Sequence, residues 1–90
     1  MREIQQRTEI TSANTWTPIT IPIGAFDFIL QLEDSTATFR VSVDNSINPT
    51  SNGLFVDQTG MYSHDGVNTA ALTLYVSAST TTFVIVQYTN

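Results

Sequence analysis

The sequence predicts an all-β fold, a single antiparallel β-sandwich or jelly roll of seven or eight short strands. Apolar and polar residues alternate with a period of two along several stretches, as in strands buried on one face. Turn signals built from Gly, Pro, Asn, Asp and Ser recur about every eight to twelve residues, which is typical of small sandwiches. The 90 residues suffice for one domain.

A domain of this size obtains only a few kcal/mol of net stability from one core. The chain has no cysteine, so neither a disulfide nor a thiolate metal site can staple it. Oligomerisation is the stapling route that needs no special residue. The composition therefore favours self-association.

The first segment, residues 1–14, is predicted to be an arm, either extended or coiled into a short helical turn, outside a sandwich domain at residues 15–90. Four charged residues distinguish this arm from the rest of the chain: Arg2, Glu3, Arg7 and Glu9. The sandwich then begins with a strand around Ile19 and Ile21. Pro18 and Pro22 confine that strand to a sheet edge, because proline donates no hydrogen bond.

The next two strands are predicted at residues 26–32 and 37–43. Both alternate regularly, and the short polar connection at residues 33–35 predicts that they form an antiparallel hairpin. Ile29 is the exception to the alternation, since it lies on the polar face of its strand.

A polar loop over residues 44–53 separates this pair from the second half of the chain. The second half is predicted to contain two short strands joined through Gly60, a turn at Asp65-Gly66, a strand at 70–76, a turn at 77–79 and a last strand at 80–88. Tyr75, like Ile29, is an apolar residue on an otherwise polar strand face.

The last strand is apolar on both faces, with Phe83 and Ile85 on one side and Val84, Val86 and Tyr88 on the other. A two-layer domain has only one inner side, so the second apolar face needs another cover, and we expect a second molecule to supply it. The candidate interface residues are Ile29, Tyr75, Val84, Val86 and Tyr88.

Charge excludes two classes of partner. Beyond the first nine residues Arg40 is the only basic residue against six acids, so this part carries the whole net charge of −5. Clustered Lys and Arg are what bind a phosphate backbone or an anionic membrane, so we expect neither nucleic acid nor membrane as a partner. The chain also shows no membrane-spanning apolar run and no signal-peptide pattern, and is expected to be soluble.

Catalytic and metal-binding patterns are weak throughout. Ser63-His64-Asp65 holds the residue types of a hydrolase triad, but consecutive strand residues point to opposite sides, and His64 is expected to be a loop residue. The acids lie at turns or on outward strand positions, which predicts turn capping rather than a glycosidase pair or a calcium site. We therefore predict no catalytic, metal-binding or cofactor-binding residue, and no enzyme activity.

From Trp16-Thr17-Pro18-Ile19-Thr20-Ile21-Pro22 to Thr82-Phe83-Val84-Ile85-Val86-Gln87-Tyr88, the chain resembles the small all-β virion proteins of tailed bacteriophages. The likeness is greatest to capsid decoration or cement proteins and to the β-rich heads of fibres, and it lies in Thr/Ser-rich strands, scarce charge and the absence of cysteine. It implies a homotrimer, or a similar symmetric assembly, on the capsid surface. The implied partner is the major capsid protein or another virion protein.

The sequence is also compatible with two other functions. The chain is alternatively a glycan- or receptor-binding module of a phage fibre or tail, with loop 44–53 and nearby aromatic residues as its binding surface. Trp16, Tyr62, Tyr75 and Tyr88 would then stack on sugar, although aromatic residues also pack in sheets and at interfaces. The remaining interpretation is a carboxylate-based hydrolase, which would need two acids facing each other in a cleft.

Overall fold

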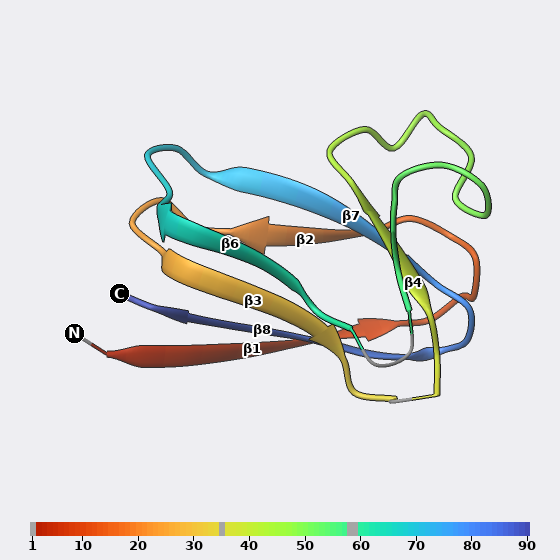
Figure 1. The fold of residues 1–90 in the computed structure, drawn as a ribbon, viewed down its shortest axis with the longest axis horizontal. Helices are drawn as coiled ribbons and strands as arrows, with labels where there is room; N and C mark the ends of the chain where they lie inside the picture. The colour runs from red at the N-terminus through yellow and green to blue at the C-terminus, as the bar shows by residue number, and fades with distance from the viewer. Residues whose placement is uncertain (1, 35, 58–59) are drawn as a thin grey trace.

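The computed structural model describes residues 2–34, 36–57 and 60–90, and these residues form eight strands in two packed sheets (Figure 1). Every strand pairing is antiparallel, so the predicted β-sandwich is confirmed. The first sheet has the order β1 (Glu3–Ile10), β8 (Thr82–Thr89), β3 (Phe26–Leu32) and β6 (Tyr62–Val67). The second has the order β2 (Thr17–Ile21), β7 (Leu72–Ala78), β4 (Phe39–Ser42) and β5 (Leu54–Val56). In the part of the chain described, no helix could cross a membrane.

The chain passes from one sheet to the other at nearly every connection. Only β4 and β5, among the described strands, are consecutive in the chain and paired with each other. The predicted hairpin between residues 26–32 and 37–43 is therefore wrong. β3 pairs with β8 and β6 in the first sheet, whereas β4 pairs with β7 and β5 in the second. Both strands alternate toward the same core, and alternation alone does not say on which side of that core a strand lies.

The amino-terminal segment is a strand of the sandwich and not an arm. β1 pairs with β8 along its whole length, from Glu3 opposite Thr89 to Ile10 opposite Thr82. Its charged residues stand at alternate, solvent-exposed positions, while Ile4 packs against the core and Ile10 is fully buried in it. The polar residues between these two isoleucines concealed the period of two, because only the ends of the inner face are apolar.

The core between the sheets is apolar and is built mainly from the inward positions of the strands, while β6 contributes the partly buried Tyr62. Its buried members are Ile10, Ile19, Ile21, Ala25, Phe28, Leu30, Leu32, Ala37, Phe39, Val41, Val56, Leu74, Val76, Ala78, Val84, Val86 and Tyr88. Burying this surface is the main stabilising contribution to the fold, since no disulfide is present. Tyr88 keeps its hydroxyl satisfied at the edge of the core, where it accepts a hydrogen bond of 3.0 Å from the Gln6 side chain.

The pairing of β3 with β6 contains a β-bulge at the position where the sequence predicted a turn. β6 runs through Asp65 and Gly66 to Val67, so the predicted turn at Asp65-Gly66 is wrong. The Asp27 carboxylate accepts a hydrogen bond of 2.7 Å from the Gly66 amide, and both residues have positive φ angles, 53° for Asp27 and 96° for Gly66. The bulge shifts the register between Phe26 and Phe28 and leaves the Phe26 side chain exposed.

The other boundaries differ by a few residues. β7 extends through Ser77 and Ala78, which were predicted to turn, because Phe39 and Arg40 of β4 pair with them. His64 lies within β6 and not in a loop. Its ring stacks on the buried Phe28 ring, with 5.3 Å between centroids and 7° between planes.

Truncation of Phe39 tests the assignment of the core. Phe39→Ala removes a buried ring and should lower the free energy of unfolding by about 3–5 kcal/mol. Phe55→Ala is the matched control, since Phe55 lies on the neighbouring strand and is about half exposed, and the substitution should cost about 1 kcal/mol or less. Urea denaturation followed by tryptophan fluorescence measures both values. Equal losses would contradict the burial of Phe39.

Candidate functional site

Three of the five candidate interface residues lie inside the molecule. Val84, Val86 and Tyr88 are on the inner face of β8 and are buried in the core, so they are not available for contact with a second molecule. The prediction that these three residues form an interface is wrong, because the sequence of a strand with two apolar faces does not show which face is the inner one. Ile29 and Tyr75 are half-buried on the outer faces of opposite sheets, and they stay predicted contact residues.

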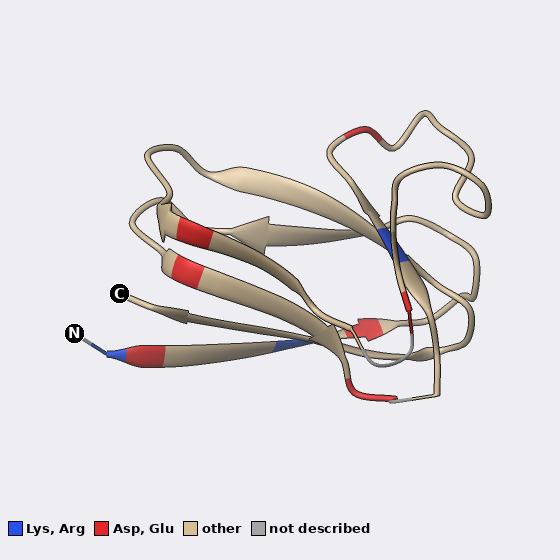
Figure 2. Ribbon diagram, in the orientation of Figure 1, with Lys and Arg blue, Asp and Glu red and all other residues tan. Residues whose placement is uncertain are grey.

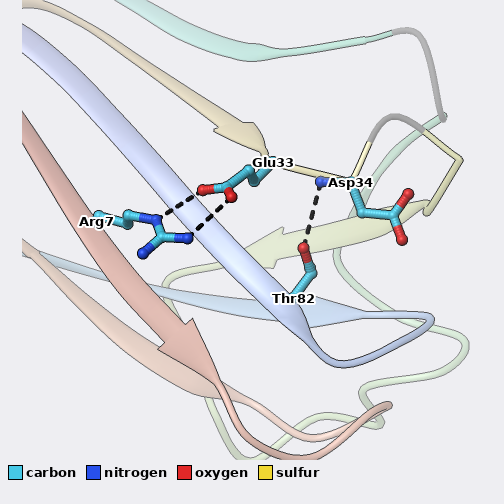
Figure 3. A network of polar contacts seen from close by, with 4 residues as sticks. All are labelled: Arg7, Glu33, Asp34 and Thr82. Carbon is cyan, nitrogen blue, oxygen red and sulfur yellow. Dashed lines mark hydrogen bonds and ion pairs between the residues drawn. The ribbon is translucent and has the colours of Figure 1, made fainter.

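The outer face of β8 is partly covered from within the chain. Phe83 and Ile85 lie on this face, and the Arg7 guanidinium sits 3.5 Å from the centroid of the Phe83 ring. The same guanidinium reaches across β8 to the Glu33 carboxylate, with Nε to Oε2 at 2.7 Å and Nη2 to Oε1 at 2.9 Å (Figure 3). Arg7 therefore supplies part of the cover that was expected from a second molecule.

The pKa of the Glu33 carboxyl is lowered below its ordinary value of 4.5, chiefly because Arg7 donates hydrogen bonds to it. Partial desolvation acts in the opposite direction, and the positive charge of Arg7 adds to the lowering. Both side chains are about half exposed, so water and salt weaken their attraction. The pair is therefore expected to stabilise the fold only modestly, and the same guanidinium also contacts the Phe83 ring.

Part of the outer face of the second sheet is covered by loop 44–53, which rises beside β4 in Figure 1. Two hydrogen bonds attach the loop: Ser77 Oγ donates to the Pro49 carbonyl at 2.8 Å, and Trp16 Nε1 donates to the Ile47 carbonyl at 2.8 Å. Gly53 closes the loop with a φ of 88°, and a Cβ there would come within 3.2 Å of the Trp16 ring. The predicted polar loop is thus held at defined points on the sheet.

A hollow of about 100 Å³ lies where this loop meets the sheet. Its lining is mostly polar and comes from β4, β5, the end of β7, the loop and the turn before β2: Asn14, Thr38, Phe39, Arg40, Pro49, Thr50, Phe55, Ser77 and Ser79. The Arg40 guanidinium lies 4.9 Å from the centroid of the Phe55 ring. Arg40 belongs to β4, where Figure 2 shows a basic segment separate from the basic segments at the amino-terminal end and on β1.

Arg40 and Phe55 were not among the residues that the sequence predicted for a site. They are brought together because Arg40 of β4 pairs directly with Phe55 of β5. The available signal was that Arg40 is the only basic residue after Arg7. The aromatic partner could not be found without the register of the two strands.

The acidic residues do not converge on a common centre. Within residues 2–34, 36–57 and 60–90, no group of three His, Asp or Glu side chains is placed to hold a metal ion. Asp34 and Asp44 instead cap their own turns, each accepting bonds from the backbone amide and hydroxyl of the residue two positions on. These bonds lower the pKa of both carboxyls. The predicted turn capping is confirmed at these two positions.

A small apolar surface lies at the end of the sandwich that carries both chain termini. We call it the terminal patch and define it as Ile23, Phe26 and Val67, whose exposed fractions are 64%, 38% and 52%. Phe26 pairs with Val67 on one side and with Thr89 of β8 on the other. Ile23 precedes Gly24, whose amide bonds to the Asn68 carbonyl next to Val67. Exposed apolar residues that gather in one region indicate a contact surface more strongly than single ones do.

No protein-family model, curated protein or solved structure matches this chain. Within the described structure, two surfaces remain open to a partner or a ligand: the hollow at Arg40 and the terminal patch.

The lowered pKa of Glu33 predicts a specific loss of stability in acid. A carboxyl whose folded-state pKa lies below its unfolded-state pKa stabilises the fold above the unfolded value, and this stability is lost as the pH falls through the folded value. The melting temperature should therefore fall less between about pH 5 and pH 2 in Glu33→Gln than in the unaltered protein. Glu3→Gln is the control, because Glu3 lies on the same face of β1 without contact to Arg7. Identical pH profiles for all three proteins would contradict a role for the Arg7–Glu33 pair.

Proposed function

We propose that this chain is a non-enzymatic structural protein of a virus particle, a capsid decoration protein that self-associates and stabilises the shell. The observation that carries the proposal is the terminal patch, which leaves apolar side chains exposed on a chain with few charges. Apolar surface of this kind contributes roughly 25 cal/mol for each Å² buried. Permanent interfaces between subunits are rich in such surface.

The fold supports this role by presenting the patch on a rigid base. Phe26 and Val67 stand on paired strands, and the bulge at Asp27 fixes the outward direction of Phe26. Ile23 belongs to the connection that leads into β3, where the Gly24 amide donates to the Asn68 carbonyl at 2.9 Å. A contact surface held by backbone hydrogen bonds loses little conformational freedom when a partner binds.

The resemblance to phage decoration proteins supplies the proposed setting, a symmetric oligomer, with a trimer favoured, on the capsid surface. Its partners would be copies of the same chain and the major capsid protein. In this assignment the patch is the contact between copies. Ile29 and Tyr75 are half-buried on the outer faces of the two sheets, and in this proposal they contact neighbouring capsid subunits.

Substitution in the terminal patch tests the proposal. Val67→Glu buries an unpaired charge in the contact, so the oligomer should dissociate to the monomer. Val43→Glu is the matched control, since Val43 is 71% exposed on a different part of the fold and should leave the mass unchanged. Light scattering over a hundredfold range of protein concentration measures the mass. A monomer in the unaltered protein, or an oligomer that survives Val67→Glu, would overturn the assignment of the patch.

A second candidate function is the glycan- or receptor-binding module. The hollow at Arg40 favours it, because an aromatic ring, a cation and several hydroxyl groups line one small depression under a fixed loop. Saccharide sites commonly combine one aromatic face with a few placed polar groups. Binding of a simple sugar by the isolated protein would support this candidate.

A further inference from the structure

We infer that the hollow at Arg40 binds a sugar residue that carries a carboxylate, of the hexuronic acid class. The inference rests on the second candidate function, a saccharide-binding module, and names its ligand. It depends on three features of the lining, which are the state of the Arg40 guanidinium, the free hydrogen-bonding groups around it and the position of the Phe55 ring.

The Arg40 guanidinium has no anionic partner in the described parts of the chain. Among the described residues its side chain forms no hydrogen bond or ion pair and contacts one aromatic ring, that of Phe55. The face of the ring attracts the positive charge, but it does not accept the five N–H groups, which lie in the plane of the guanidinium. Arg7, by contrast, is paired with Glu33 through two hydrogen bonds. A carboxylate is the group that matches this planar fork of donors, and it does so through two parallel bonds.

The polar groups beside Arg40 offer both donors and acceptors. Ser79 Oγ accepts a bond of 3.1 Å from the Thr38 amide, which leaves its own proton free to be donated. Thr50 and Ser77 already donate their protons, to Asn48 and to the Pro49 carbonyl, so their oxygens are free to accept. Sugar hydroxyl groups both donate and accept, and this mixed lining suits them.

The Phe55 ring gives the hollow an apolar wall. It is 53% exposed in spite of its contact with Arg40, so part of the ring is open to a ligand. The C–H face of a pyranose ring can pack there while its carboxylate reaches Arg40. A hollow of about 100 Å³ is well below the roughly 300–1,000 Å³ of sites for larger ligands, so one sugar residue is the expected occupant.

The net charge restricts the ligand further. A chain with a formal charge of −5 repels polyanions, and a single guanidinium neutralises only one negative group. Phosphate-rich ligands and densely sulfated chains are therefore disfavoured. A single acidic sugar within an otherwise neutral glycan is compatible both with the one guanidinium of Arg40 and with the net negative charge of the protein.

The test is an NMR titration of isotope-labelled full chain with three probes: the methyl glycoside of glucuronic acid, the methyl glycoside of glucose, and acetate. The glucuronide should shift the Arg40 Nε–Hε, Phe55 ring and Ser79 signals in a saturable way. The glucoside lacks the charge and acetate lacks the sugar ring, so the affinity of each should be lower than that of the glucuronide by a factor of about ten or more. A loss of this size is expected when a charged hydrogen bond or the ring contacts are removed. Equal affinity for the glucoside would overturn the carboxylate assignment and keep the saccharide module. Equal affinity for acetate would overturn the saccharide assignment.

Three variants make the result specific to the hollow. Arg40→Gln should weaken glucuronide binding by about tenfold or more. Arg40→Lys keeps the charge without the planar fork of donors, so its affinity should lie between those of Arg40→Gln and the unaltered protein. Arg2→Gln removes the same charge from the amino-terminal end and should bind normally. A dispersed amide spectrum for each variant establishes that it folds. The inference would be overturned if the named residues showed no saturable shift, or if Arg40→Gln bound the glucuronide as tightly as the unaltered protein does. The light-scattering measurement of the oligomer is a separate test and does not depend on either result.

Discussion

The pairing of β8 with both β1 and β3 is the constraint on which the first sheet depends. β8 fills the position between them, and its inner face contributes Val84, Val86 and Tyr88 to the core. β1 has no other neighbour in its sheet, so the first strand of the chain cannot be placed until the last one is present. In a chain without cysteine, these hydrogen bonds and the core beneath them hold the two ends of the molecule together.

The same arrangement makes nearly all of the strand contacts non-local. Because the chain crosses between the sheets at almost every connection, every pairing of the described strands except that of β4 with β5 joins distant parts of the sequence. Loop-closure entropy must be overcome before such contacts contribute, so a fold of this topology forms slowly compared with one built from hairpins. The turns capped by Asp34 and Asp44 are the local structure that reduces this cost.

The sequence allowed most strands to be predicted, and the core face of those that alternate regularly, but not the strands with which they pair. Alternation located most strands within a few residues, and proline correctly placed β2 at an edge. The expected hairpin was wrong because two strands that face the same core from opposite sides have the same pattern as two adjacent strands. β1 was missed because only Ile4 and Ile10 mark its inner face. Val84, Val86 and Tyr88 were wrongly predicted to be interface residues, because both faces of β8 are apolar and the pattern does not show which face is the inner one. The Arg40–Phe55 contact depends on strand register, which no single strand contains.

Two surfaces with different chemistry therefore occupy separate parts of one small sandwich. The terminal patch is apolar and suits a permanent contact, whereas the hollow at Arg40 is polar and suits an exchangeable ligand. They share no residue, so one can be altered by substitution without touching the other. A protein that is anchored through one surface can in this way present the second to its surroundings.

The position of the two chain ends has a mechanical consequence. The Arg2 and Asn90 backbones exchange two hydrogen bonds of 2.9 Å, so β1 and β8 end side by side. A force that pulls these ends apart acts on the outermost hydrogen bonds first and separates the two strands like a zipper, one pair at a time. Force applied instead along the strands would load the whole ladder together. The molecule should thus yield readily to tension at its ends and resist tension applied lengthwise.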